Sequence, residues 1–239
     1  MKTAFITGAN KSIGLATARQ LGKTGYHIFL GSRSLQNGET AARQLAAEGI
    51  QVTVIQADIA NKDSVEKAQA EIAAKTDHLD TLINNAGILG KLPQPPSQTD
   101  PETILEVFDT NFFGTIRTTQ AFLGLLRAAA APRIVNVTSD LASLTRHSDP
   151  GWKYYSFKGA AYGPSKTALN AYTLALAYEL RDTAFKVNCV NPGYTATDFN
   201  NYRGEKSPEQ AAKIIVKFAT LDASGPTGKF YSEEGETPW

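Results

Sequence analysis

Residues 7–14, TGANKSIG, follow the short apolar run Ala4–Ile6 and precede a stretch whose apolar residues recur at helical spacing. A turn of this kind, from a strand into a helix, presents backbone N–H groups and the positive end of the helix dipole to a pyrophosphate. The spacing differs from the G-x-G-x-x-G fingerprint, but it matches T-G-x-x-x-G-x-G at every position except Ser12. The stretch therefore predicts a dinucleotide-binding loop, although alone it also fits a tight strand-to-helix turn. Its candidate cofactor-binding residues are Gly8, Asn10, Lys11, Ser12, Ile13 and Gly14.

Ser12 stands where such a loop usually has glycine. A serine held in the left-handed conformation would cost roughly 1–2 kcal/mol. We therefore expect Ser12 to adopt an ordinary backbone angle and to turn its hydroxyl towards phosphate or the helix N-terminus. On this view, Ser12→Gly changes cofactor affinity only slightly.

Short β-rich runs alternate with longer helical patterns along the whole chain. Strands that are almost continuously apolar, separated by crossover helices, are typical of parallel sheets covered on both faces. Two helix starts are explicit, because Asp100-Pro101-Glu102 and Ser207-Pro208-Glu209 each combine a capping side chain, a proline and an early acid. The pattern predicts a doubly wound, Rossmann-type α/β fold with a mainly parallel seven-stranded sheet. The seven expected strands are residues 3–7, 27–31, 52–56, 81–85, 133–137, 186–190 and 228–232.

Composition limits the possible classes of function. The 239 residues show no break in composition, so we expect one dinucleotide-binding catalytic domain over residues 1–239. The net charge of +1 provides no broad field for nucleic acid or a membrane surface, and we expect a cytoplasmic protein. The three histidines lack the spacing of metal ligands, so no metal site is expected. Cys189, the single cysteine, is expected to be a buried strand residue.

The end of the second expected strand bears on the choice of dinucleotide. An NAD site usually places an acid here to accept the ribose hydroxyls, but this chain has Ser32 and Arg33. A guanidinium makes paired hydrogen bonds to phosphate, and Lys11 could reach the same group. Both cations could instead be solvated surface residues. Together with the missing acid they favour NADP(H) over NAD.

The segment YGPSK, residues 162–166, places Tyr162 and Lys166 four residues apart on one helix face. A nearby cation favours the phenolate, so Tyr162 could give or take a proton near neutral pH. A packed tyrosine beside a solvated lysine would have the same spacing. The pair alone is therefore weak evidence.

Six motifs in order make the chain resemble the short-chain dehydrogenase/reductase family. They are TGANKSIG, NNAG at 84–87, Asn111 in DTNFFG, Ser139 after RIVNVT, YGPSK, and NPGYTAT at 191–197. The resemblance implies that Tyr162 is the catalytic acid or base, that Lys166 lowers its pKa and holds the nicotinamide ribose, and that Ser139 bonds the substrate oxygen. It implies that Asn111 holds a water of a proton relay. The further cofactor contacts that it implies are Asp58, Ile59, Asn85, Ala86, Gly87, Pro192, Gly193, Thr195 and Thr197.

The lengths of two segments bear on the substrate pocket that the resemblance implies. The segment between Ser139 and Tyr162 is longer than is usual in the family and resembles that of its carbonyl reductases. Only residues 198–207 separate the last motif from the next helix, so we expect a fairly open pocket. The candidate pocket walls are Leu89, Leu141, Tyr155, Tyr194 and Phe199.

The resulting hypothesis is an NADPH-dependent reductase of small to medium ketones or aldehydes, reversible as an alcohol dehydrogenase. An NAD-linked alcohol dehydrogenase and a non-catalytic nucleotide-sensing protein on the same fold are the alternatives. The resemblance also implies a homo-oligomer, a dimer or tetramer packed through the helices of Asn111 and Tyr162. The long segment before Tyr162 could hinder that packing.

Overall fold

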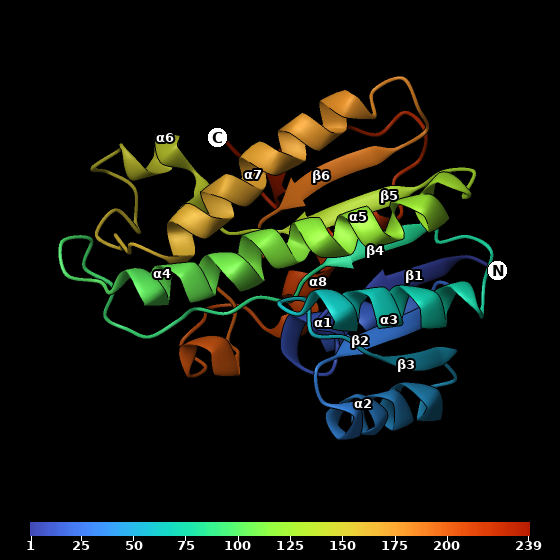
Figure 1. The fold of residues 1–239 in the computed structure, drawn as a ribbon. Coiled ribbons are helices and arrows are strands. Elements are labelled where there is room, and N and C mark those ends of the chain that lie inside the picture. Colours follow the sequence, from blue (N-terminus) through green and yellow to red (C-terminus); the bar gives the residue numbers. More distant parts are fainter.

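The computed structural model describes residues 1–239 and contains one sheet of eight strands in the order β3-β2-β1-β4-β5-β6-β7-β8 (Figure 1). All neighbouring strands are parallel except β7 and β8. The strands are β1 (Thr3–Ile6), β2 (His27–Ser32), β3 (Val52–Gln56), β4 (Thr81–Asn84), β5 (Arg133–Val137), β6 (Lys186–Val190), β7 (Phe230–Ser232) and β8 (Gly235–Glu236).

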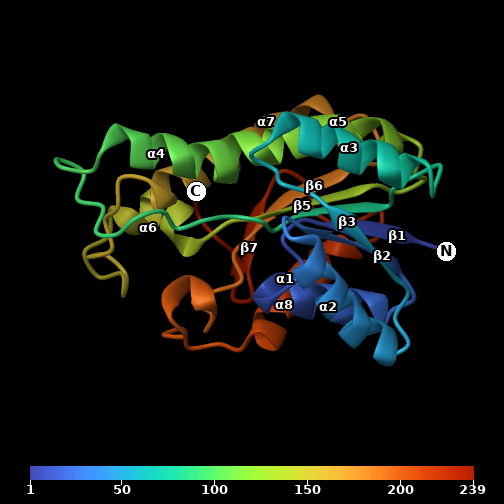
Figure 2. The same cartoon turned by 60° about the horizontal axis from the view of Figure 1, so that its bottom comes forward.

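Helices cover both faces of the sheet, as a doubly wound fold requires. Figure 2 shows α1, α2 and α8 on one face and α3, α4, α5 and α7 on the other. The helices are α1 (Ser12–Gly22), α2 (Leu35–Ala47), α3 (Lys62–Ala73), α4 (Pro101–Phe108), α5 (Gly114–Arg127), α6 (Leu144–His147), α7 (Tyr162–Glu179) and α8 (Pro208–Ala219).

The predicted Rossmann-type fold is confirmed, but the prediction of seven strands was wrong. The eighth strand, β8, contains only two residues and pairs antiparallel with β7 through Tyr231 and Glu236. Gly235, the first residue of β8, has a φ of +124°, a conformation open to glycine. A two-residue strand rich in Gly and Glu leaves no apolar run in the sequence, so periodicity could not indicate it.

Alternate side chains of the strands pack into separate cores above and below the sheet. In β1, Ile6 belongs to the core beneath α1 and α8, whereas Phe5 belongs to the core beneath α3, α5 and α7. Phe5 packs against Phe122 of α5 at a ring-centroid distance of 4.7 Å. Each such side chain contributes about 1.5–3 kcal/mol when it leaves water. Both faces of β1 are therefore held by packing, which fixes the loop that follows it.

The order of the strands places a crevice next to β1. The chain runs outward from β1 to β2 and β3, then returns to place β4 on the other side of β1. Ile6, near the end of β1, is level with Leu30 of β2 and Ile83 of β4. Ligands of doubly wound sheets bind at this reversal, outside the carboxyl ends of the strands.

The two predicted helix starts are confirmed. Asp100 accepts a hydrogen bond from the Glu102 N–H at the start of α4. Ser207 and Gln210 form a reciprocal capping box at the start of α8. Cys189 is buried in β6, as expected. Among the helices, none combines the length and apolar character needed to cross a bilayer.

Candidate active site

The loop after β1 packs so tightly against its neighbours that two of its positions require glycine. Gly8 has a φ of +62°, and a Cβ there would lie 3.1 Å from Ala86. A Cβ on Gly14 would lie 2.6 Å from the side-chain nitrogen of Asn85. The carbonyls of Thr7 and Gly8 both accept hydrogen bonds from that Asn85 nitrogen, at 3.0 and 3.1 Å. The loop is thus pinned to the end of β4, and it leaves room at the N-terminus of α1.

Thr7 is a site residue that sequence reasoning missed. Its hydroxyl accepts hydrogen bonds from the N–H groups of Asn85 and Ala86, each at 3.0 Å. It therefore ties the end of β1 to the end of β4. The threonine directly before Gly8 in the TG pair was the available signal.

The expectation that Ser12 has an ordinary backbone angle was wrong. Its φ is +50°, in the left-handed region that favours glycine. Its hydroxyl donates to Asp198 Oδ1 at 2.9 Å and lies against the segment after NPGYTAT. The loop keeps the path that a glycine would take because its ends are fixed by β1, β4 and α1, and the distant acid compensates part of the strain.

The left-handed angle changes the expected behaviour of Ser12 variants. Ser12→Gly and Ser12→Ala both lose the hydroxyl, but only alanine keeps the conformational strain. We expect the free energy of unfolding to be roughly 1–2 kcal/mol larger for Ser12→Gly than for Ser12→Ala. Urea denaturation of the two variants measures the difference. Equal stabilities would mean that residue 12 is not strained in solution.

The two cations that the sequence predicted as phosphate ligands, Lys11 and Arg33, differ in their surroundings. Lys11 forms an ion pair with Asp198, and this lysine is the main cause that lowers the pKa of the Asp198 carboxyl. Arg33 is exposed and its side chain makes no hydrogen bond or ion pair, while Gln56 Nε2 donates to its carbonyl at 3.2 Å. Ser32 is buried and donates to the Ser34 carbonyl at 2.8 Å. The guanidinium of Arg33 is thus available to an anion at the end of β2.

Asp58 and Ile59 follow β3 and lie beside this crevice. The Asp58 carboxylate accepts from the Ala60 N–H at 3.1 Å, so it stabilises the turn between β3 and α3. Ile59 is buried, and a Cβ on Gly114 would come within 2.9 Å of it. Ile59 therefore packs against the start of α5.

The sequence places Tyr162 at the first residue of α7 and Ser139 two residues beyond β5, and the structure brings them together. Burial raises the pKa of Tyr162 to about 12, and a hydrogen bond with Ser139 partly offsets this rise. Burial is thus the largest influence on the pKa of the Tyr162 phenol. Near neutral pH the phenol therefore carries its proton.

Lys166 lies one helical turn after Tyr162 and is only 4% exposed. Its Nζ donates to the Val137 carbonyl at 2.9 Å and lies 5.9 Å from the Tyr162 ring centroid. Burial lowers the pKa of Lys166 to about 8. A Cβ on Gly87 would lie 3.5 Å from this Nζ. The absence of a side chain at Gly87 thus keeps the space beside the ammonium open.

Asn111 is buried in a π-helical turn, Asp109–Phe113, between α4 and α5. Its Oδ1 accepts from the Ile88 N–H at 2.8 Å, and its Nδ2 donates to the Ile88 carbonyl at 2.9 Å. Nδ2 also donates to Ser165 Oγ at 3.1 Å. Both amide hydrogens are used, so Asn111 links the segment after β4 to α7 and keeps one lone pair of Oδ1 for a further donor.

Gln94 is a second site residue that sequence reasoning missed. It is buried, and its Oε1 accepts from the Tyr162 N–H at 3.3 Å. Its Nε2 donates to the Leu89 carbonyl at 2.8 Å. It thereby satisfies one of the free N–H groups at the start of α7 and holds Tyr162. A single glutamine in a proline-rich loop gives no periodic or motif signal.

The NPGYTAT segment after β6 is held mainly by its own polar groups. Asn191 Oδ1 accepts from the Gly193 N–H at 2.9 Å, and Thr195 Oγ1 donates to the Gly193 carbonyl at 3.0 Å. Gly193 has a φ of +81°. Pro192, Thr195 and Thr197 are buried. The segment therefore forms a fixed wall outside the end of β6.

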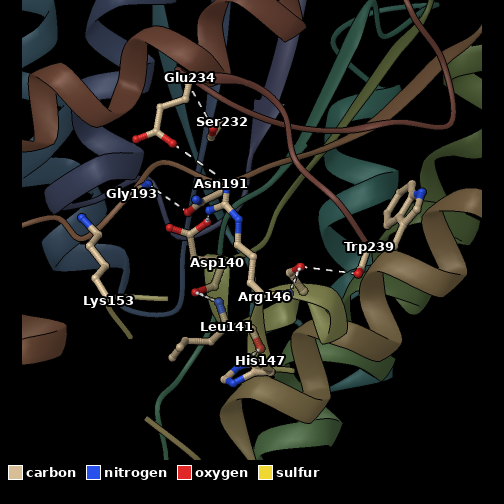
Figure 3. Close-up of polar contacts among 12 residues, drawn as sticks. Asp140, Leu141, Arg146, His147, Lys153, Asn191, Gly193, Ser232, Glu234 and Trp239 are labelled. Carbon is tan, nitrogen blue, oxygen red and sulfur yellow. Dashed lines mark hydrogen bonds and ion pairs between the residues drawn. The ribbon is translucent and has the colours of Figure 1, made fainter. Parts of the chain in front are cut away.

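The long segment between Ser139 and Tyr162 is joined to the last residues of the chain. Figure 3 shows Arg146 between Asp140 and Glu234, and it forms ion pairs with both. The Trp239 carbonyl accepts from the Thr145 N–H at 2.9 Å. These contacts fix the segment that directly follows Ser139.

Several aromatic rings lie beside this segment and beside Tyr162. Tyr154 packs edge-on against Tyr194 at 6.1 Å, whereas the expected wall residue Tyr155 is exposed and lies under Lys158. Phe199 packs edge-on against Tyr162 at a centroid distance of 5.4 Å. Phe199 thus lies against the ring of Tyr162, on the side where the sequence predicted an open pocket.

The features observed here fit a nicotinamide dinucleotide: a glycine-shaped turn at a helix N-terminus, open space at Gly87, and a buried ammonium beside it. Comparison with known proteins supports the assignment. The family described as short chain dehydrogenase matches residues 2–208. The chain is similar to short-chain dehydrogenase anuI of Penicillium roqueforti, with 37% identity over 90% of this chain and 87% of that protein.

Two further proteins are similar over nearly their whole length. Carbonyl reductase [NADPH] 1 of Mus musculus is 30% identical over 99% of this chain and 98% of that protein. The solved structure of salutaridine reductase from Papaver somniferum superposes with a TM-score of 0.84 at 26% identity, covering 97% of this chain and 99% of that one. The chain therefore belongs to the short-chain dehydrogenase family, whose members are oxidoreductases that use a nicotinamide cofactor.

Proposed function

We propose that the protein is an NADPH-dependent carbonyl reductase acting on small to medium ketones or aldehydes, with alcohol oxidation as the reverse reaction. The observation that carries the proposal is the convergence of Ser139, Tyr162 and Lys166 outside the ends of β4, β5 and β6. An exposed Arg33 with no partner supports NADPH over NADH.

The cofactor would be held along the crevice from Arg33 to Thr195. Arg33 and Ser32 would meet the adenosine 2′-phosphate, the loop from Gly8 to Gly14 would hold the pyrophosphate, and Lys166 would hold the nicotinamide ribose. Asp58 and Ile59 would lie at the adenine. The remaining contacts would come from Asn85, Ala86, Gly87, Pro192, Gly193, Thr195 and Thr197.

When bound, the cofactor supplies a hydride to the carbonyl carbon. Tyr162, protonated near neutral pH, donates its proton to the carbonyl oxygen, and Ser139 orients that oxygen by hydrogen bonding. Lys166 keeps a positive charge near the phenol and stabilises the phenolate left after proton transfer. Asn111 would hold a water on the free lone pair of Oδ1, through which Lys166 exchanges protons with solvent.

Lys166 makes the reaction pH-dependent. Its pKa is lowered to about 8, so the ammonium is present below this pH and is lost as the pH rises through it. We expect kcat/KM for carbonyl reduction to be level below about pH 7.5 and to fall by about tenfold per pH unit well above pH 8. A pH profile measured with saturating NADPH checks this. A flat profile to pH 10 would contradict the role of Lys166.

An assay of NADPH and NADH oxidation with a panel of ketones and aldehydes tests the proposed function. Faster oxidation of NADPH in the presence of carbonyl compounds supports it. A preference for NADH would favour the NAD-linked alcohol dehydrogenase. Tight dinucleotide binding without any turnover would favour a nucleotide-sensing protein.

We also propose a homo-oligomer that packs through α4, α5 and α7. Helices α4 and α5 run end to end through the π-helical turn, and α7 lies beside them in both views of the fold (Figures 1 and 2). Apolar side chains are exposed on α4, on the π-helical turn and on α7. The exposed residues are Leu105, Phe113, Leu174 and Tyr178.

The oligomer is tested at Leu174. We expect light scattering to give a dimer or tetramer for the unchanged protein and a smaller species for Leu174→Glu, because the charge would be buried in the contact. Leu35→Glu, on the exposed part of α2, is the matched control and should leave the mass unchanged. A monomeric unchanged protein would contradict the proposal.

A further inference from the structure

Asp198 connects two parts of the site that are distant in the sequence. Its carboxylate accepts a hydrogen bond from Ser12 in the phosphate-binding loop, at 2.9 Å, and forms an ion pair with Lys11. The next residue, Phe199, packs edge-on against Tyr162 at 5.4 Å. One short segment thus links the cofactor loop to the phenol assigned to proton transfer.

We propose that Asp198 is a positioning residue: anchored by Ser12, it holds Phe199 as an aromatic wall of the substrate space beside Tyr162. This inference rests on the proposed carbonyl reductase function and assigns its substrate preference. An aromatic wall beside the reacting oxygen favours ketones with an aryl or bulky apolar substituent over small aliphatic ketones, because rings pack against its edge or face.

The contacts of the segment explain why this anchor matters. Within the segment, Asn200 Nδ2 donates to the Thr195 carbonyl at 2.8 Å, which fixes the end beyond Phe199 to the preceding wall. Asn201 and Tyr202, which follow, both have positive φ angles. Of residues 198–200, only Asp198 has a side-chain hydrogen bond to the cofactor loop. Without Asp198, Phe199 would keep its link to the wall but lose its link to the loop.

The hydrogen bond from Ser12 is the more directional of the two Asp198 contacts. Lys11 and Asp198 are both well exposed, so their ion pair is weakened by salt and by side-chain entropy. Ser12, in contrast, is held in a left-handed conformation at the start of α1, and this conformation aims its short side chain. The serine that replaces glycine in the loop thereby acquires a function: it provides a rigid donor for Asp198.

The Asp198→Asn and Asp198→Ala pair isolates this hydrogen bond. Asparagine retains an oxygen acceptor for Ser12 but loses the charge, whereas alanine loses both. We expect Asp198→Ala to raise KM for an aryl ketone such as acetophenone by about tenfold, the order expected for one lost positioning contact, with kcat and the KM for acetone changed less than about threefold. Asp198→Asn should retain most of the wild-type preference for acetophenone over acetone, at low and at high salt concentration.

Two further variants complete the comparison. Phe199→Ala should reduce the preference for the aryl ketone at least as much as Asp198→Ala. Glu205→Ala is the matched control, because Glu205 is an exposed acid in the same loop that pairs at 3.5 Å with Lys153 only. It should leave both KM values unchanged.

Hydrogen exchange reports on the anchor independently of turnover. We expect faster amide exchange over residues 198–203 in Asp198→Ala than in Asp198→Asn or Glu205→Ala. Equal exchange in all three would overturn the anchor, and equal loss of acetophenone and acetone reduction in Asp198→Ala would overturn the positioning role. A wild-type enzyme that reduces neither ketone nor any other carbonyl compound would instead reject the proposed function itself.

Discussion

Tyr162→Phe is expected to lower kcat for carbonyl reduction by at least about 100-fold, the scale of a lost general acid. The phenylalanine keeps the ring that packs against Phe199 and removes only the hydroxyl. Dinucleotide affinity should change little, since Lys166 retains its hydrogen bond to the Val137 carbonyl. Steady-state kinetics and a fluorescence titration with NADPH measure the two quantities separately.

The control for this variant removes a phenol elsewhere. Tyr26 lies directly before β2, at the amino end of the sheet and opposite the site, where its ring packs near Lys2. Tyr26→Phe should leave kcat unchanged. Turnover near the wild-type rate in Tyr162→Phe would show that another group supplies the proton, and the assignment of Tyr162 would then be wrong.

The sequence predicted the fold and the approximate position of the site for the same physical reason. Alternating apolar runs and helical patterns require parallel strands, and in such a sheet the residues after each strand gather at one edge. Asn85, Ser139 and Asn191 all follow strands, and the structure places their segments around the same crevice. The roles of the residues on helices, such as Tyr162 and Lys166, came instead from the resemblance to a family.

The conformation of Ser12 could not be predicted in this way. The local conformational preference of serine favoured an ordinary backbone angle. In the structure, however, Asp198, 186 positions away, accepts a hydrogen bond from the Ser12 hydroxyl. Gln94 was missed because its role depends on a contact between its own loop and the first residue of α7. The pKa of Tyr162 depends on how far the phenol is buried, whereas the spacing of residues 162 and 166 in the sequence indicates only that Lys166 is near. Each of these features is set by long-range contacts.

The structure also changes what is expected of the cations at the adenosine end. The sequence predicted Arg33 as the ligand of the 2′-phosphate, with Lys11 able to reach the same group. In the structure Lys11 is paired with Asp198, whereas the side chain of Arg33 has no partner. Recruiting Lys11 to a phosphate would weaken an existing ion pair, but recruiting Arg33 would not. Arg33 is therefore expected to contribute more to the choice between NADPH and NADH.

Arg33→Ala accordingly should reduce the preference for NADPH over NADH, measured as the ratio of kcat/KM values, by about one to two orders of magnitude. A charge-assisted hydrogen bond contributes roughly 1.5–3 kcal/mol, and a guanidinium can make two bonds to one phosphate. The reaction with NADH should be nearly unaffected, because an unmodified ribose offers no anion. Lys11→Ala is the matched control and should reduce the ratio less, because Asp198 already competes for that ammonium. An unchanged ratio in Arg33→Ala would mean that Arg33 is a solvated surface cation, and the proposal of NADPH would lose its main support.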